Sequence, residues 1–124
     1  MRWKQLELPL LLAIAVSVPA QSKTESAHGP DCSGTWPTNM AFVHLKNAGI
    51  TDNSKVDFSK TKTVRLASER IGKDLFHQVY DVNFTEKTGS VIEVIAIHDA
   101  SYEECSMTGV EVFVVSRHLN PDRK

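Results

Sequence analysis

The sequence lacks the short motifs that mark common catalytic and cofactor sites. It contains no GxSxG or HExxH pattern, and its 6 glycines do not gather into a phosphate-binding loop. Its carboxylates are scattered, and no pair has a spacing that by itself indicates acid–base catalysis. We therefore expect a protein that is not an enzyme, has no catalytic residues and needs no cofactor.

Cysteine is scarce as well. The chain has 2 cysteines, Cys32 and Cys105, and no CxxC or HxxxH spacing. This pattern disfavours a zinc site, whose ligands usually come in closely spaced pairs. An even number of cysteines in an exported chain instead predicts one disulfide between them, which would also leave no free thiol for catalysis.

The start of the chain has the features of an export signal. Arg2 and Lys4 give a positive start, residues 8–18 form an apolar run, and Val18-Pro19-Ala20 offers small residues to an export peptidase. The run is too short to span a bilayer comfortably, since a spanning helix needs about 20 residues, and the alternative to a signal peptide is a weak membrane anchor. We expect residues 1–20 to be a signal peptide, residues 21–31 a flexible leader and residues 32–124 a single periplasmic or secreted domain.

The remaining charge is balanced. Removing residues 1–20 leaves 12 basic and 14 acidic side chains, a net charge of −2. This balance disfavours nucleic-acid binding and a polybasic membrane-surface role, so we expect no nucleic acid partner and no membrane insertion of the mature chain. One basic group is interleaved with Asp57 and indicates a solvated loop and strand edge: Lys55, Lys60, Lys62 and Arg65.

Hydrophobic periodicity predicts one helix followed by four strands. Pro37 suits a first helical turn, Ala41, Leu45 and Ala48 form one apolar stripe, and Gly49 favours a helix end. The connections between the strands are short, which implies antiparallel neighbours. We expect an α+β fold in which one N-terminal helix packs on a four-stranded antiparallel meander sheet. The expected ranges are 37–48 for the helix and 61–71, 75–85, 90–98 and 110–118 for the strands.

Two predicted strand segments, 90–98 and 110–115, carry large apolar residues on both faces. One helix covers only one face of a sheet, so the second face needs another cover. Three covers are open. The sheet can curl and close on itself, the leader or residues 51–60 can fold over it, or a second protein can bind there as a partner or as another copy.

Two histidines are candidates for a metal site. His77 and His98 face each other if the strand register is symmetric about residues 86–89, and Asp99 would then lie nearby as a further ligand. A slip of one residue separates the pair. We expect two ordinary surface histidines and no metal.

Residues 99–107 form the most distinctive polar segment. A disulfide at Cys105 would pin this loop, and a pinned loop loses less entropy on binding. Aromatic side chains with charged neighbours are good interface anchors, and acidic side chains suit a positive cleft on a partner. The alternative is a solvated loop whose only role is the disulfide. The candidate partner-binding residues are Asp99, Tyr102, Glu103, Glu104 and Met107.

Four segments carry a resemblance to known proteins: Trp36-Pro37-Thr38-Asn39-Met40, Lys46-Asn47-Ala48-Gly49, Lys62-Thr63-Val64-Arg65-Leu66-Ala67-Ser68 and Glu103-Glu104-Cys105-Ser106-Met107. Through them the stretch from Cys32 to Leu119 resembles a family of small, mostly uncharacterised secreted or periplasmic proteins of Gram-negative bacteria. In size, export and single disulfide, the chain is also similar in architecture to periplasmic immunity proteins and lysozyme inhibitors.

We therefore expect a periplasmic protein of immunity or inhibitor type, which binds and neutralises a toxin or a cell-wall hydrolase. The second-face apolar surface and the pinned loop motivate this expectation. The alternative is an envelope-maintenance or stress module without catalysis, which binds a small ligand or associates with itself as a homodimer.

Overall fold

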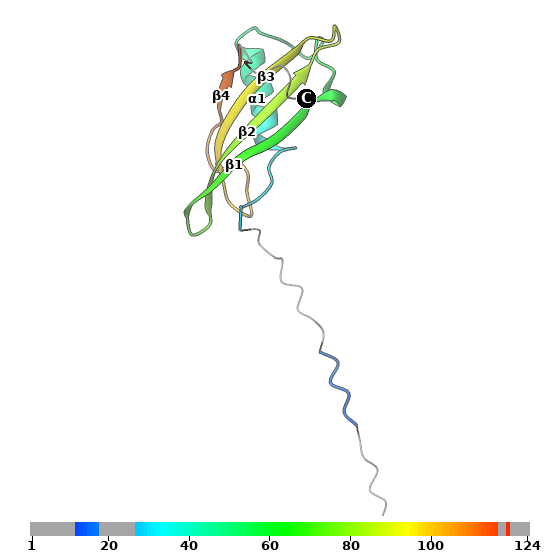
Figure 1. The fold of residues 1–124 in the computed structure, drawn as a ribbon, viewed down its shortest axis with the longest axis vertical. Coiled ribbons are helices and arrows are strands. Elements are labelled where there is room, and N and C mark those ends of the chain that lie inside the picture. The colour runs from blue at the N-terminus through cyan, green and yellow to red at the C-terminus, as the bar shows by residue number, and fades with distance from the viewer. Residues whose placement is uncertain (1–11, 18–26, 117–118, 120–124) are drawn as a thin grey trace, which may run out of the picture.

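The computed structural model describes residues 12–17, 27–116 and 119. It confirms the expected fold: one helix packed on a four-stranded antiparallel sheet of strand order β1-β2-β3-β4 (Figure 1). Most of the predicted signal peptide and the first part of the predicted leader lie outside the described residues. No helix within the described ranges is long and apolar enough to cross a membrane. The elements are α1 (Trp36–Asn47), the 3-10 helix η1 (Phe58–Lys60), β1 (Lys62–Gly72), β2 (Leu75–Thr85), β3 (Val91–Ala100) and β4 (Glu111–Val114).

Helix α1 begins and ends where its sequence predicts. Pro37 lies in the first turn, where its missing N–H has no intrahelical partner to lose. Ala41 and Leu45 are buried against the sheet, as their spacing indicates. Gly49 follows the helix with a φ of 72°, a left-handed conformation that glycine adopts without steric cost. Ala48, which the apolar stripe predicts to be buried, is instead the exposed C-cap residue, because the helix ends at Asn47.

The sheet is a meander of hydrogen-bonded hairpins. The β2–β3 pairing runs without a break from Phe76 opposite Ala100 to Thr85 opposite Val91. The β1–β2 pairing contains an irregularity between Arg65 and Ala67, where β1 holds one extra residue. This bulge reverses which residues of β1 point to each face of the sheet.

One face of the sheet, together with α1, forms the core. Alternate residues of β2 and β3 point toward the helix, so each strand buries one side and leaves the other side partly open. Phe58 of η1 packs edge-on against Phe42 of α1, with ring centroids 4.9 Å apart, so the Phe58 ring also lies on the helix side. The largest buried side chains of the two strands are Phe76, Gln78, Tyr80, Val82, Phe84, Val94 and His98.

The end of the predicted leader is held on the helix side of the sheet. The Arg65 guanidinium donates to the Pro30 carbonyl at 2.8 Å, and the Gln78 side-chain amide donates to the same oxygen at 2.7 Å. Gly29 is buried directly against the Phe76 ring. Residues 29–31 thus form part of the folded domain, because β1 and β2 supply the polar groups that their carbonyls need.

The disulfide that the sequence predicts is present, with Cys32 and Cys105 joined and their Cα atoms 5.8 Å apart. Cys32 is fully buried, and its N–H donates to the Tyr80 hydroxyl at 2.9 Å. That hydroxyl donates in turn to Gln78 at 2.7 Å. The bridge spans 73 residues, and in the loop-entropy model a closure of this length stabilises the fold by about 4 kcal/mol.

Replacing Gly29 by alanine should destabilise the protein strongly. Gly29 has a φ of 77°, and a Cβ atom there would lie 2.6 Å from Cγ of the buried Phe76 ring. We expect the free energy of unfolding to fall by at least about 2 kcal/mol, measured by urea denaturation. Gly34→Ala is the matched control, since a Cβ at Gly34 meets no atom within 4 Å. Equal stability of the two variants would contradict the docking of residues 29–31 on the sheet.

Candidate functional site

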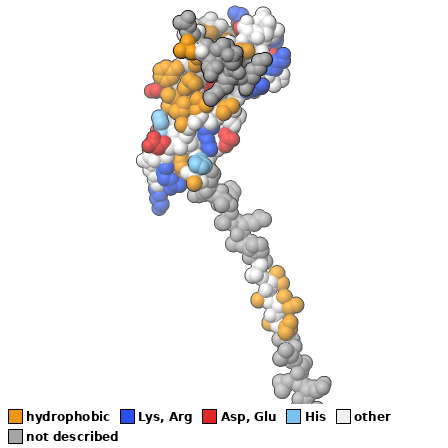
Figure 2. All heavy atoms as spheres, in the orientation of Figure 1, with side chains coloured by type: hydrophobic (Ala, Val, Ile, Leu, Met, Phe, Trp, Pro, Cys, Tyr) orange, Lys and Arg blue, Asp and Glu red, His pale blue; other side chains and the backbone are white. Residues whose placement is uncertain are grey.

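The sheet face that points away from α1 is apolar and uncovered by the described residues. We call this the open face and define it by Val64, Val79, Ile95, Ile97 and Phe113, which strand pairing places on one side. Val64 is 58% exposed and Phe113 is 55% exposed. Figure 2, in the orientation of Figure 1, shows hydrophobic side chains gathered over the sheet.

Two of the three covers expected for this face are not seen in the described part of the chain. The sheet does not close on itself, because β1 and β4 are its two edges and do not pair with each other. Pro30 of the leader and Phe58 of the 51–60 segment contact the helix side instead. Cover by a second protein, either a partner or another copy of the chain, stays a prediction.

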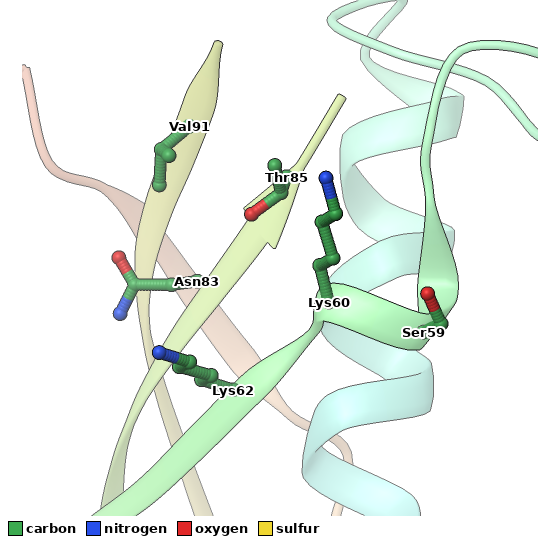
Figure 3. A pocket seen from close by; sticks show the side chains of 6 residues that line it. All are labelled: Ser59, Lys60, Lys62, Asn83, Thr85 and Val91. Carbon is green, nitrogen blue, oxygen red and sulfur yellow. The ribbon is translucent and has the colours of Figure 1, made fainter. Parts of the chain in front are cut away.

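A hollow of about 520 Å³ lies at one end of the open face, and we call it the lysine hollow. Figure 3 shows its lining, which consists of Ser59, Lys60, Lys62, Asn83, Thr85 and Val91. Lys62 is the cross-strand partner of Asn83, and Thr85 is the partner of Val91, so the hollow opens on the same side as the apolar residues. The sequence indicated only a solvated edge here, because the cross-strand pairing that joins these residues cannot be read from β1 alone.

The lysine hollow also contains a Ser-x-x-Lys spacing, Ser59 to Lys62, which is found at the nucleophile of some acyl-transfer enzymes. Here the two residues lie on different elements, Ser59 in η1 and Lys62 in β1. The Ser59 hydroxyl donates to the Asp57 carboxylate at 2.6 Å, which caps the turn. Figure 3 shows Ser59 and Lys62 on opposite sides of the hollow. The arrangement is that of a capped turn and not of a nucleophile beside its base.

A second hollow, of about 310 Å³, lies toward the opposite end of the open face, and we call it the acidic hollow. Its lining includes His77, Ile97, Asp99, Thr108 and Glu111. His77 Nδ1 lies 2.6 Å from an Asp99 carboxylate oxygen, and the two residues are directly opposite each other on β2 and β3. The open face therefore has cationic side chains at one end and carboxylates at the other.

The strand register separates the two candidate histidines. Asp99 lies opposite His77 and Gln78 lies opposite His98, so His77 points to the open face and His98 points to the core. The expectation of two surface histidines is wrong for His98, which is only 2% exposed. No group of three or more metal-ligating side chains is found among the described residues.

His98 is an unusual core residue. Its ring lies beside that of Tyr80, with centroids 5.5 Å apart, and neither ring nitrogen has a hydrogen-bond partner within the described structure. Burial lowers the pKa of His98 below its ordinary value, because the charged imidazolium is poorly solvated there. A histidine in an apolar strand can face either side of the sheet, so the sequence alone does not predict that His98 is buried.

The loop between β3 and β4 is braced from several directions. The Ser101 N–H donates to the Glu104 carbonyl at 2.8 Å, and the Asp99 N–H donates to the Thr108 hydroxyl at 2.9 Å. The Trp36 indole N–H at the start of α1 donates to the Thr108 carbonyl at 3.0 Å. Together with the disulfide at Cys105, these bonds fix a loop that has no regular secondary structure.

The structure does not bring the five candidate partner-binding residues onto one surface. Asp99 lies on the open face with His77, whereas the Tyr102 ring packs edge-on against the buried Phe76 at 5.0 Å. Glu103, Glu104 and Met107 are exposed on the loop, Met107 by 46%. Tyr102 therefore supports the loop from within, and the candidates that the loop leaves exposed are two acids and one methionine.

His98 should make the stability of the protein depend on pH. Because its pKa is lowered in the folded state, the unfolded chain binds a proton more readily, and the free energy of unfolding should fall as the pH is lowered through about 6.5. His98→Gln removes the titrating ring and should reduce the difference in unfolding free energy between pH 7.5 and pH 5, measured by urea denaturation. His44→Gln, at an exposed position of α1, should leave that difference unchanged. The same pH dependence in both variants would contradict a neutral, buried His98.

Comparison with protein-family models, with curated proteins and with solved structures found no match to this chain. The fold, the braced loop and the open face are therefore the basis for any functional conclusion.

Proposed function

We propose that this protein is a periplasmic binding protein of immunity or inhibitor type, which neutralises a toxin or a cell-wall hydrolase by occupying it and not by catalysis. The observation that supports this proposal most is the braced loop of residues 101–109. It combines a covalent tether at Cys105 with the exposed side chains of Glu103, Glu104 and Met107.

Rigidity is the first argument for this loop as the binding element. A flexible loop loses about 0.5–1.5 kcal/mol for each side chain that it orders on binding, and a preorganised loop avoids part of that cost. The backbone of this loop is already held at Ser101, Cys105 and Thr108. Tyr102 adds a further support, because its backbone N–H donates to Asp74 at 2.9 Å while its ring packs on Phe76.

Charge is the second argument. Glu103 and Glu104 are adjacent and exposed, and the Glu104 carboxylate is oriented by a hydrogen bond from the Ser106 hydroxyl at 2.7 Å. Two fixed carboxylates beside the exposed Met107 suit a concave partner site with cationic side chains and an apolar wall.

The proposed location follows from two features of the chain. The predicted signal peptide directs export, and the Cys32–Cys105 disulfide is of a kind that persists in oxidising compartments. The periplasm supplies such conditions, and it is also where toxins and hydrolases that act on the cell wall are met.

Neutralising the loop acids should weaken the proposed inhibition. A panel of purified cell-wall hydrolases and periplasm-acting toxins is assayed with the protein, and at least one should be inhibited stoichiometrically. Glu103→Gln/Glu104→Gln should weaken that inhibition at least about tenfold, since it removes two charge-assisted contacts.

The control changes the net charge equally at the other end of the molecule. Asn53→Lys/Thr88→Lys adds two positive charges at exposed positions far from the loop, and it should inhibit as the unaltered protein does. Failure to inhibit any member of the panel, or equal loss in the control, would overturn the assignment of the loop as an inhibitory element.

A further inference from the structure

We propose that a second copy of this chain covers the open face, with the lysine hollow of one copy lying over the acidic end of the other. The proposal concerns the sheet and does not depend on the inhibitory role of the loop. Two features carry it: the apolar centre of the open face, and the opposite charges at its two ends.

The apolar centre provides the driving force. Val64 and Phe113 are more than half exposed, and Val79, Ile95 and Ile97 lie between them with only partial burial. Strands about 4.8 Å apart and about 30 Å long give a sheet of this size roughly 500 Å² of flat area. A standard interface buries about 800 Å² of accessible surface per partner, and a pleated face of side chains has more accessible surface than flat area. The open face is thus large enough for a dimer at the weak end of the range.

The charges provide the orientation. At one end of the face lie Lys60 and Lys62, with Glu93 beside Asn83 as a carboxylate on the same side. At the other end, cross-strand pairing aligns Glu69, His77 and Asp99 in one row, and Glu111 lies next to it on β4. Asp81, opposite Val64, lies between the two ends. Lys60 is paired with the Asp57 carboxylate at 4.0 Å, so Lys62 is the cation that we assign to the contact with the second copy. Carboxylates predominate toward the other end of the face.

A two-fold axis that lies between the two sheets and runs perpendicular to the strands satisfies both features. It places the strands of the two copies antiparallel, with β1 over β1, so that Lys62 of one copy lies over the Glu69 end of the other. Because the interface is symmetric, every such contact occurs twice. An axis along the strands would instead bring Glu69 of one copy toward Glu111 of the other, and like charges placed opposite each other are destabilising.

The proposed dimer leaves the braced loop accessible. The two loops would lie at opposite ends of the assembly, because each follows the acidic end of its own sheet. Asp99 would then lie in the dimer interface, whereas Glu103, Glu104 and Met107 would remain exposed. The dimer would therefore present two binding loops that face apart.

Charge reversal within the face tests the arrangement. Sedimentation velocity over a range of concentrations should show a reversible dimer for the unaltered protein. Lys62→Glu and Glu69→Lys should each weaken it by about tenfold, because each places like charges opposite each other. Mixing the two variants should restore association, since the mixed pair has opposite charges at both ends. Lys55→Glu, an exposed reversal off the open face, is the control and should have no effect.

Phe113→Asp tests the apolar centre independently. Ile50→Asp is its control, because Ile50 is similarly exposed, by 44%, but lies beyond the end of α1 and not on the open face. Only Phe113→Asp should abolish the dimer, and circular dichroism should show all variants folded. A monomer at every concentration overturns the proposal. A stronger dimer in Glu69→Lys, or a dimer sensitive to Phe113→Asp but to neither reversal, overturns the proposed orientation.

Discussion

A single helix cannot cover both faces of a four-stranded sheet, and this geometric limit organises the whole molecule. Helix α1 buries one side of β2 and β3, where Phe76, Tyr80 and Val82 form the core with Ala41 and Leu45. The opposite side retains valine, isoleucine and phenylalanine side chains in contact with solvent. The exposed surface of these side chains adds nothing to the stability of a monomer, since burial of apolar surface is the main favourable term in folding and in association.

The helix side shows how a small domain compensates for a modest core. A buried polar chain runs from the Cys32 N–H through the Tyr80 hydroxyl and Gln78 to the Pro30 carbonyl, and every step is a hydrogen bond of ordinary length. Burial raises the pKa of Tyr80, so the hydroxyl keeps the proton that this chain needs. The disulfide lies at one end of it, and the leader and the β3–β4 loop are thus fixed by connected interactions.

The braced loop and the open face are separate surfaces with different physical roles. The loop is polar, covalently tethered and exposed, which suits recognition of a charged cleft. The open face is broad and apolar with opposite charges at its ends, which suits a symmetric partner. Asp99 links the two, because its side chain lies on the open face near the end of β3 while its N–H donates to the Thr108 hydroxyl of the loop.

The sequence by itself determined the element types, their order and the disulfide, because helix and strand periodicity, turn residues and cysteine count are local properties. It also identified the excess of apolar strand surface. Only the tertiary structure decided which side chains meet, because facing depends on register: pairing with β2 sends His77 outward and His98 into the core. Simple alternation would place Lys62 and Glu69 on opposite faces, and the extra residue between Arg65 and Ala67 puts both on the open face. Likewise Tyr102 turns inward because Phe76 lies beneath it, a contact between residues of different strands and loops that no local pattern encodes.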